Sequence, residues 1–205
     1  MNSLNHALLL YTNPQSRGAI AVWMLEELGV PYDIKVLPYG EAMQSVEYRR
    51  LNPMAKVPCL VHGDQIVTET AAICAYLADA FPQAGLAPDK RGAYYRWLFF
   101  TAGPFEAAVT NHSLGIEIPV EKQGFVGYGS YDRTIQTMAE ALRESSYIAG
   151  DTFTAADVYV GSHINWGLQF GSIPDKQEFK DYWQRLAGRD AYRRSTEKNA
   201  SLQSS

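Results

Sequence analysis

Asn52-Pro53-Met54-Ala55-Lys56-Val57-Pro58-Cys59-Leu60 is the segment that constrains the fold most tightly. Proline lacks an N–H donor, so Pro58 cannot occupy an interior position of a β-ladder, and we expect it where a strand is entered or at a sheet edge. A cis bond between Val57 and Pro58 would turn the main chain of Val57 outward and offer its N–H and C=O to a ligand. The residues alone favour a trans bond, since about 5 to 6% of X-Pro bonds in folded proteins are cis.

Strand and helix patterns alternate on both sides of this segment. Apolar runs and two-residue alternation predict strands, whereas apolar positions on one helical face predict helices. A Gly-Asp turn between two short apolar runs predicts an antiparallel hairpin. The first 80 residues therefore predict β-α-β followed by β-β-α, with an irregular polar segment between them. The expected ranges are strands at 7–11, 32–36, 58–61 and 66–68, helices from Ser16 to Leu28 and at 70–80, and the irregular segment at 39–50.

The composition of the sequence changes at residues 81–90, where Pro82, Gly85 and Pro88 predict a linker. Beyond it the sequence predicts helices alone, at about 89–114, 120–145 and 155–170, with a polar pair at about 176–198. The small, polar residues 199–205 are expected to fray. This organisation gives a thioredoxin-like α/β domain at 1–80 and an all-helical domain at 91–205.

A helix start is marked by Thr154 and Asp157, which are placed to satisfy each other's main-chain donors in a capping box. Phe153 and Val158 are placed as a hydrophobic staple beside it. The role of this segment is in folding.

The motif Asn-Pro-x-x-Lys-Val-Pro-x-Leu resembles a segment of the soluble glutathione transferases, and the capping box occurs at a matching place in their helical domain. The resemblance extends over nearly the whole chain and is closest to bacterial members, with the class left open. It implies that the bond before Pro58 is cis and that Val57 pairs with the cysteinyl main chain of glutathione. It also implies that Lys56 meets the glycine carboxylate of the tripeptide; the alternative is a solvated lysine.

Glu69 and Thr70 follow Pro58 at the spacing of the family's Glu-Ser-x-Ala-Ile segment, with Thr70 in the serine's place. A helix N-terminus attracts a carboxylate, and Glu69 is suited to an ammonium. A γ-glutamyl group carries both charges on one carbon, so these residues are expected to receive it. The plainer interpretation is that Thr70 only caps the helix.

The turn after the first strand, Tyr11-Thr12-Asn13-Pro14-Gln15-Ser16-Arg17, contains the candidates for activating the thiol. A hydroxyl at a helix start can donate to a thiolate and lower its pKa from a free value near 8.5. Ser16 stands where many similar bacterial transferases have Ser or Cys, and Tyr11 where the tyrosine-type classes have their catalytic phenol. Thr12 is a third candidate, and a main-chain or Asn13 contact is the remaining alternative. The turn lacks the cysteine of a glutaredoxin, so the nucleophile would be the sulfur of bound glutathione.

Aromatic residues are dense in the first helix of the second half. Helical spacing places some of them in the core, and the others would line an apolar pocket for an electrophile beside the sulfur. The candidates are Tyr95, Phe99, Phe105 and Trp166.

Composition excludes several other classes of protein. The chain of 205 residues is 46% hydrophobic and 20% charged, with a net charge of -4, which argues against disorder and against a nucleic-acid partner. We expect no signal peptide, no membrane span and no metal site, and we interpret Cys59 and Cys74 as buried thiols in a reducing cytoplasm.

These features predict a cytoplasmic, dimeric glutathione transferase with a role in detoxification. It would use glutathione as co-substrate and add its thiolate to an apolar electrophile. A glutathione-dependent reductase, lyase or isomerase on the same fold is the enzymatic alternative, although the isomerase's Ser-Ser-Cys turn is missing. A non-catalytic protein-interaction module is the other alternative, but it would not need a γ-glutamyl receptor.

Overall fold

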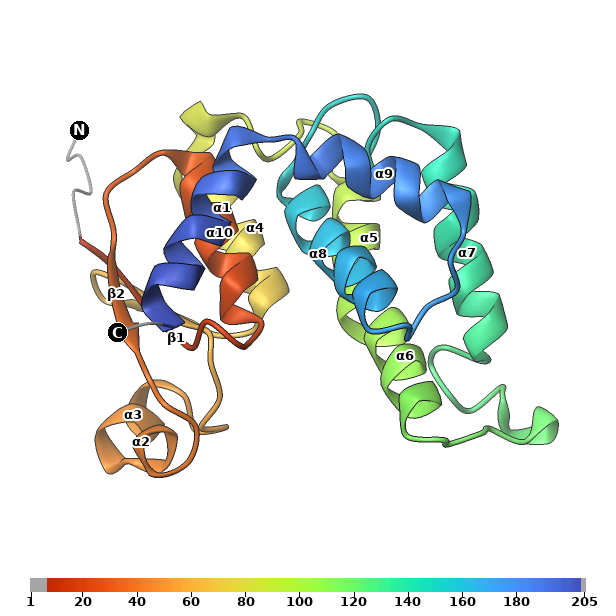
Figure 1. Cartoon of the computed structure of the whole chain (residues 1–205), viewed down its shortest axis with the longest axis horizontal. Helices are drawn as coiled ribbons and strands as arrows, with labels where there is room; N and C mark the ends of the chain where they lie inside the picture. The colour runs from red at the N-terminus through yellow and green to blue at the C-terminus, as the bar shows by residue number, and fades with distance from the viewer. Residues whose placement is uncertain (1–6, 204–205) are drawn as a thin grey trace. The chain divides into compact units, whose positions relative to one another are not determined.

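The computed structural model describes residues 7–203 (Figure 1). The chain divides into two compact units, one formed by residues 1–84 with 189–205 and the other by residues 85–188. The predicted linker at 81–90 contains this division. Residues 189–203 were expected in the helical domain, but in the structure they group with the first unit.

The first unit contains a four-stranded mixed sheet in the order β2-β1-β3-β4. β1 pairs in parallel with β2 and antiparallel with β3, and β3 pairs antiparallel with β4 across a turn in which Gly63 has a φ of +62°. This arrangement confirms the predicted β-α-β and β-β-α order. The strands are β1 (Leu8–Thr12), β2 (Asp33–Val36), β3 (Cys59–His62) and β4 (Gln65–Val67).

Strand alternation gives the sheet two different faces. Leu10 and Leu60 are paired neighbours with no exposed surface, on the same face as Thr12, which contacts the start of helix α1 (Gly18–Leu28). Tyr11 and Cys59, the next pair, point to the opposite face and pack in a small separate cluster. The sheet is therefore covered on both faces.

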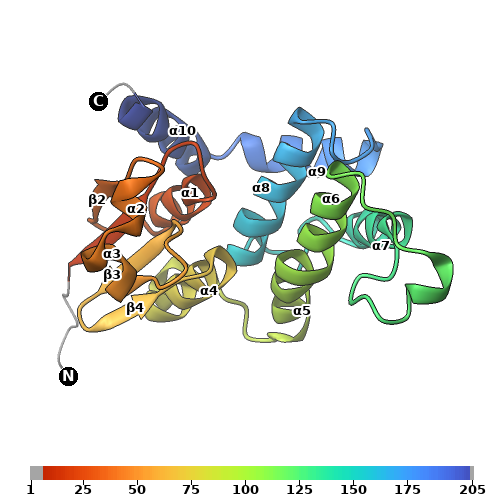
Figure 2. The ribbon, with the colours of Figure 1, turned by 90° about the horizontal axis from the view of Figure 1, so that it is seen from below.

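The segment expected to be irregular, 39–50, contains two short helices, α2 (Glu41–Gln44) and α3 (Val46–Leu51). Ser45 caps α3 by accepting a hydrogen bond from the main-chain N–H of Tyr48. Met43 and Tyr48 are buried and pack with Leu37 and Cys59. In Figure 1, α2 and α3 lie apart from α1 and α4 (Thr70–Ala80), and Figure 2 shows the same helices from below. The sequence prediction missed these helices because each is too short to display a helical period.

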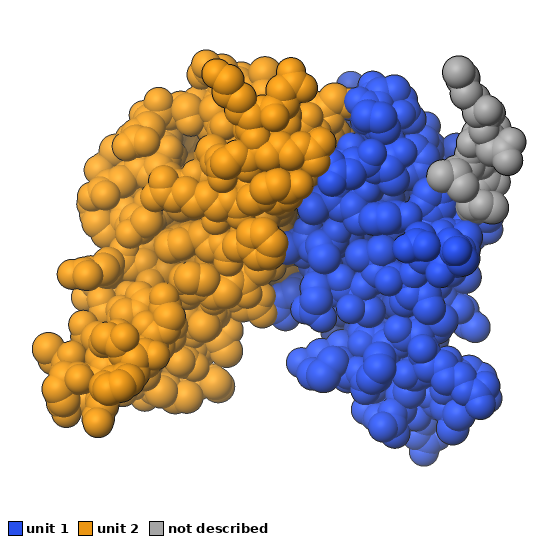
Figure 3. Space-filling model, turned by 180° about the vertical axis from the view of Figure 1, so that it is seen from behind, with its two compact units in different colours: residues 1–84, 189–205 blue, residues 85–188 orange. Residues whose placement is uncertain are grey.

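The second unit, residues 85–188, is coloured orange in Figure 3. Its secondary-structure elements are all helices. One long helix is interrupted by a π-helical turn, Thr101–Phe105, that contains Pro104; such a turn is expected where proline removes a main-chain donor. The other helices are α5 (Gly92–Phe100), α6 (Glu106–Ser113), α7 (Tyr131–Glu144), α8 (Ala155–Gln169) and α9 (Gln177–Ala187).

The capping box at the start of α8 is confirmed. The Asp157 carboxylate accepts hydrogen bonds from the main-chain N–H groups of Thr154 and Ile148 and from the hydroxyl of Tyr182, each at 2.8 Å. Asp157 and Tyr182 have no exposed surface. Burial raises the pKa of the Asp157 carboxyl, although these hydrogen bonds act in the opposite direction. Asp157 therefore ties the start of α8 to α9 and to the preceding loop.

Two further helix boundaries differ from the prediction. The helix expected at 120–145 begins at Tyr131, where Ser130 accepts from the N–H of Arg133, because Gly124, Gly127 and Gly129 disfavour helix before it. Before that start, Val120–Lys122 forms a 3₁₀ turn. The expectation that residues 199–205 fray is wrong up to Gln203, because α10 (Asp190–Gln203) continues that far; Ser204 and Ser205 lie outside the described residues.

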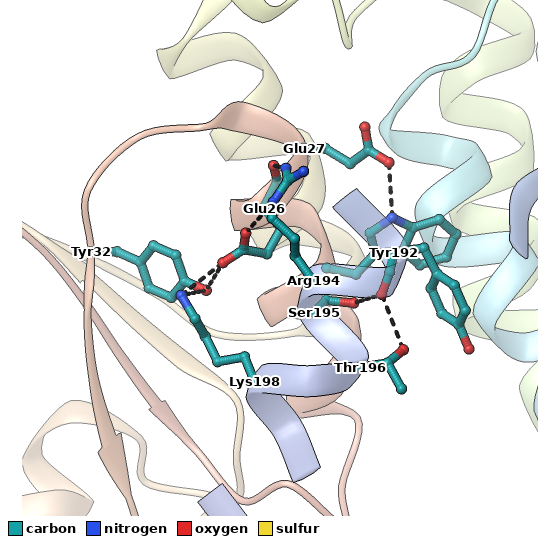
Figure 4. Close-up of polar contacts among 9 residues, drawn as sticks. Glu26, Glu27, Tyr32, Tyr192, Arg194, Ser195, Thr196 and Lys198 are labelled. Carbon is teal, nitrogen blue, oxygen red and sulfur yellow. Dashed lines mark hydrogen bonds and ion pairs between the residues drawn. The ribbon is translucent and has the colours of Figure 1, made fainter. Parts of the chain in front are cut away.

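Helix α10 packs on α1, and its polar contacts reach the Glu26 carboxylate near the end of α1 (Figure 4). Glu26 accepts from Lys198 and from the hydroxyl of Tyr32, each at 2.7 Å, and from Arg194 at 3.0 Å. Glu27, the next residue, accepts from the indole N–H of Trp23 on the same helix at 2.9 Å. The contacts from Lys198 and Arg194 to Glu26 hold the last helix on the first unit.

Candidate functional site

The Val57–Pro58 bond is cis, as the family resemblance implies. Pro58 is buried and immediately precedes β3, which is the strand-entry position expected for a proline. Val57 is half-buried, and within the described residues its main-chain N–H and C=O make no hydrogen bond to protein. Its main chain is therefore available to a ligand.

Lys56, the residue before Val57, is held in place through its main chain. Its carbonyl oxygen accepts hydrogen bonds from the hydroxyl of Tyr48 at 2.6 Å and from Nδ2 of Asn52 at 2.7 Å. The Lys56 side chain is exposed, as a contact with a ligand carboxylate would require. Sequence reasoning missed Tyr48 and Asn52, although Asn52 lies in the motif and Tyr48 is an aromatic residue in the polar segment 39–50.

Glu69 precedes α4 with a φ of +62°, in the left-handed region that non-glycine residues seldom adopt. Such conformations cost free energy and are found often at binding sites. The Glu69 side chain is exposed.

Thr70 is the first residue of α4 and is buried, so the expectation that its hydroxyl caps the helix is not met; Glu69 occupies the cap position without a side-chain bond. The first hydrogen bond along this helix runs from the N–H of Ile73 to the carbonyl of Glu69. The N–H groups of the first turn are thus free of intrahelical partners and suit an anion.

Ser16 lies in the turn before α1 and is half-buried. Its hydroxyl donates to the carbonyl of Asn13 at 2.6 Å and accepts from the N–H of Gly18 at 2.9 Å. Asn13 is itself fixed, since its Nδ2 donates to the carbonyl of Leu37 and its Oδ1 accepts from the N–H of Gln15. To donate to a thiolate, the Ser16 hydroxyl would have to leave the Asn13 carbonyl.

The other two hydroxyl candidates have different surroundings. Thr12 has no exposed surface, and its hydroxyl has no hydrogen-bond partner among the described residues. Its Oγ1 lies where a side chain on Gly18 would stand, 1.9 Å from the ideal Cβ position. Tyr11 is half-buried, with its ring 5.4 Å from that of Tyr48 and the ammonium of Lys35 5.4 Å above it. Thr12 is therefore enclosed beneath α1, whereas Tyr11 retains an exposed part.

Sheet register brings the three predicted segments together. Tyr11 at the end of β1 pairs with Cys59 at the start of β3, and Val67 at the end of β4 pairs with Leu60. The turn with Ser16, the Val57–Pro58 bond and Glu69 therefore all lie at the same end of the sheet.

Comparisons with known proteins indicate the family of the chain. Residues 19–80 match the family model described as glutathione S-transferase, N-terminal domain. Over 172 residues the chain is 29% identical to glutathione S-transferase GST-4.5 of Xanthomonas campestris pv. campestris, covering 79% of this chain and 83% of that one. The chain belongs to the glutathione S-transferase family.

Two other relatives of this transferase-family chain bear on its function. The disulfide-bond oxidoreductase YghU of Escherichia coli is 30% identical over 195 residues, covering 86% of this chain and 66% of YghU. The theta class glutathione S-transferase of Xanthomonas axonopodis pv. citri, solved with glutathione bound, aligns with a TM-score of 0.71 at 25% identity, covering 93% of this chain and 97% of that one.

The aromatic residues predicted for this transferase's electrophile pocket lie in the helical unit with different exposure. Phe99 is 71% exposed and Tyr95 38% exposed, with their rings 6.4 Å apart, and Trp166 is half-buried. Phe105 is 1% exposed and belongs to the core of its unit.

Other expectations concern thiols, metals and membranes. Cys59 and Cys74 are buried free thiols, and burial raises their pKa to about 11 and about 12. Within residues 7–203, no three His, Cys, Asp or Glu side chains gather as metal ligands would. In the same range, no helix has the length and apolar character needed to cross a bilayer.

Proposed function

We propose that this member of the glutathione S-transferase family binds glutathione in its first unit, stabilises the thiolate and adds it to an apolar electrophile. One observation carries the proposal: the unpaired main chain of Val57, the carboxylate of Glu69 and the free N–H groups of α4 gather at one end of the sheet. The charges and hydrogen-bonding groups of this set complement those of the tripeptide.

The γ-glutamyl part of glutathione carries an ammonium and a carboxylate on one carbon. Glu69 would receive the ammonium, and the first turn of α4 at Thr70 would receive the carboxylate. Val57 would pair with the cysteinyl main chain, and the exposed Lys56 would meet the glycine carboxylate as a solvent-screened ion pair.

The cysteinyl sulfur would then lie near the turn between β1 and α1. A hydroxyl donor and the N-terminus of α1 both favour the thiolate over the thiol. We propose Ser16 as the donor, with Tyr11 and Thr12 as alternatives. The thiolate attacks an electrophilic carbon, so that a C–S bond forms and the carbon's leaving group departs or its double bond takes up the electron pair and then a proton.

We propose that Tyr95, Phe99 and Trp166 supply apolar contacts for the electrophile, with Phe105 supporting them from the core. Apolar pockets discriminate weakly between substrates, so a range of electrophiles is expected. We further propose that the protein is a cytoplasmic homodimer.

Reduction of disulfides with glutathione is a second candidate function, favoured by the similarity to YghU. The two functions share the tripeptide site and differ in the atom attacked, which is carbon in one and sulfur in the other. Assays with an aryl halide, an enone and a simple alkyl disulfide separate them.

Titration of the wild-type chain with glutathione by calorimetry tests the shared site. Glu69→Ala should weaken binding at least about tenfold, since it removes the ammonium's charged partner. Glu47→Ala is the matched control, because Glu47 is an exposed glutamate in the first turn of α3 in the same unit. Lack of binding by the wild type, or full binding by Glu69→Ala, would contradict the proposal.

A further inference from the structure

The peptide group between Lys56 and Val57 is held by two side chains. Tyr48 and Asn52 both donate to its carbonyl oxygen, at 2.6 and 2.7 Å. The same peptide group carries the N–H of Val57. Because a peptide is planar and its C=O and N–H point in opposite directions when trans, fixing the carbonyl also fixes the N–H.

Both donors are themselves immobilised. Tyr48 is 3% exposed and packs with Leu37, Met43 and Cys59. Burial raises the pKa of the Tyr48 hydroxyl above its usual value, so this group stays protonated and donates at neutral pH. The carbonyl thus has one donor that is fixed by the small cluster beneath it.

Asn52 is 4% exposed, and both the nitrogen and the oxygen of its side-chain amide form hydrogen bonds. Its Oδ1 accepts from the N–H of Met54 at 3.1 Å while Nδ2 binds the Lys56 carbonyl. Its main-chain N–H donates to the carbonyl of Tyr48 at 2.9 Å. The two donors are therefore linked to each other as well as to their shared acceptor.

We propose that Tyr48 and Asn52 are positioning residues that aim the N–H of Val57 at the cysteinyl main chain of glutathione. The Val57 N–H points away from this pair of donors and has no partner within residues 7–203. Two hydrogen bonds to the carbonyl also polarise the peptide and make its N–H a stronger donor. The inference rests on the proposed function, since it concerns the same tripeptide site.

The test compares two variants that each lose one tyrosine hydroxyl. Tyr48→Phe keeps the buried ring but removes its hydrogen bond to Lys56. Tyr32→Phe is the control, because the Tyr32 hydroxyl donates to Glu26 at 2.7 Å in the contact region of α1 and α10. Glutathione affinity is measured by calorimetry, the thermal midpoint of each variant is recorded, and KM and kcat are measured with one electrophile.

Tyr48→Phe should raise the Kd and the KM for glutathione about 3- to 10-fold, the range for one hydrogen bond. The kcat at saturating glutathione should stay within about twofold, because the lost contact aids binding of the tripeptide in ground and transition states alike. Tyr32→Phe should leave Kd and KM unchanged even where its thermal midpoint falls as much as that of Tyr48→Phe.

Asn52→Ala adds a second measurement. Combined with Tyr48→Phe, it leaves the shared carbonyl without a side-chain donor, so the loss of affinity in the double variant should differ from the product of the single losses. Unchanged affinity in Tyr48→Phe, or an equal loss in Tyr32→Phe, would overturn the positioning role while the proposed function stands. A wild-type chain that does not bind glutathione would instead refute the proposed function and this inference with it.

Discussion

Arg189 donates two parallel hydrogen bonds to the carboxylate of Glu27, from Nε to Oε1 and from Nη2 to Oε2, each at 2.7 Å. The Glu27 side chain is 5% exposed and that of Arg189 is 32% exposed. Paired hydrogen bonds of this kind fix direction as well as charge. Arg189 immediately precedes α10, so this pair sets where the last helix starts along α1.

Arg189→Ala is expected to lower the free energy of unfolding by about 1 to 3 kcal/mol, because it leaves a nearly buried carboxylate without its cation. Urea unfolding measures the change. The control is Arg193→Ala, which removes an exposed ion pair with Asp190 on the same helix and should cost at most about 0.5 kcal/mol. Equal effects of the two substitutions would contradict the anchoring role of Arg189.

Glu26 should make the stability of the first unit depend on pH. Burial acts to raise the pKa of its carboxyl, but hydrogen bonds from Lys198, Tyr32 and Arg194 outweigh burial, and the net pKa lies below 4.5. A carboxyl whose pKa is lower in the folded than in the unfolded state stabilises the fold above the unfolded pKa. That contribution is lost as the pH falls through the folded pKa.

Glu26→Gln should therefore be less stable than the wild type at neutral pH, and the difference should shrink as the pH falls below 4.5. Urea midpoints measured at several pH values provide the comparison. Glu47→Gln changes an exposed glutamate and should have little effect at any of them. If the difference in urea midpoint between Glu26→Gln and the wild type is the same at every pH, the charge on Glu26 does not stabilise the contact.

Gly18 should not tolerate a side chain. A Cβ at this position would stand 1.9 Å from the Thr12 hydroxyl oxygen and 3.0 Å from the Thr12 Cβ, and Thr12 is short, branched and fully buried. Gly18→Ala is expected to destabilise the protein by about 1 to 3 kcal/mol, the usual range for overpacking.

Thr12→Ala combined with Gly18→Ala should recover part of that loss, because it removes the obstructing hydroxyl. Gly92→Ala is the matched control, since Gly92 also begins a helix and nothing lies within 4 Å of its ideal Cβ position. It should be neutral or slightly stabilising, because alanine favours helix. Failure of the double variant to recover stability would place the clash elsewhere.

Local patterns were sufficient to predict much of this fold. Thr70–Ala80 was predicted at its observed bounds, and the capping box at Thr154 was confirmed, because both depend on signals within a few residues. The cis bond before Pro58 followed from the family resemblance and not from the residues themselves. Each success reflects information held in one short segment.

The failures have a different physical origin. Tyr48 and Asn52 act on Lys56 through hydrogen bonds made possible by two helices too short to show a period. Residues 199–203 at the end of helix α10 have the composition of a fraying tail, and the helix is held through Glu26 and Glu27, more than 160 residues earlier in the chain. Such contacts between distant segments leave no periodic pattern in the sequence.

Ser16 is expected to control the acidity of bound glutathione. Ser16 is half-buried at the start of α1, and its hydroxyl already accepts the N–H of Gly18 and donates to the Asn13 carbonyl. If the hydroxyl donates to a thiolate instead, a neutral acceptor is replaced by a charged one. Hydrogen bonds to charged acceptors are stronger. Ser16→Ala should raise the apparent pKa of bound glutathione, read from the ultraviolet absorbance of the thiolate against pH at saturating glutathione. The Tyr11→Phe variant, which keeps the ring packed beside Tyr48, should titrate like the wild type. If Tyr11→Phe raises the pKa and Ser16→Ala does not, the phenol is the donor. If neither does, the remaining candidates are a main-chain or Asn13 contact and Thr12, whose enclosed hydroxyl would reach a ligand only after the start of α1 moves.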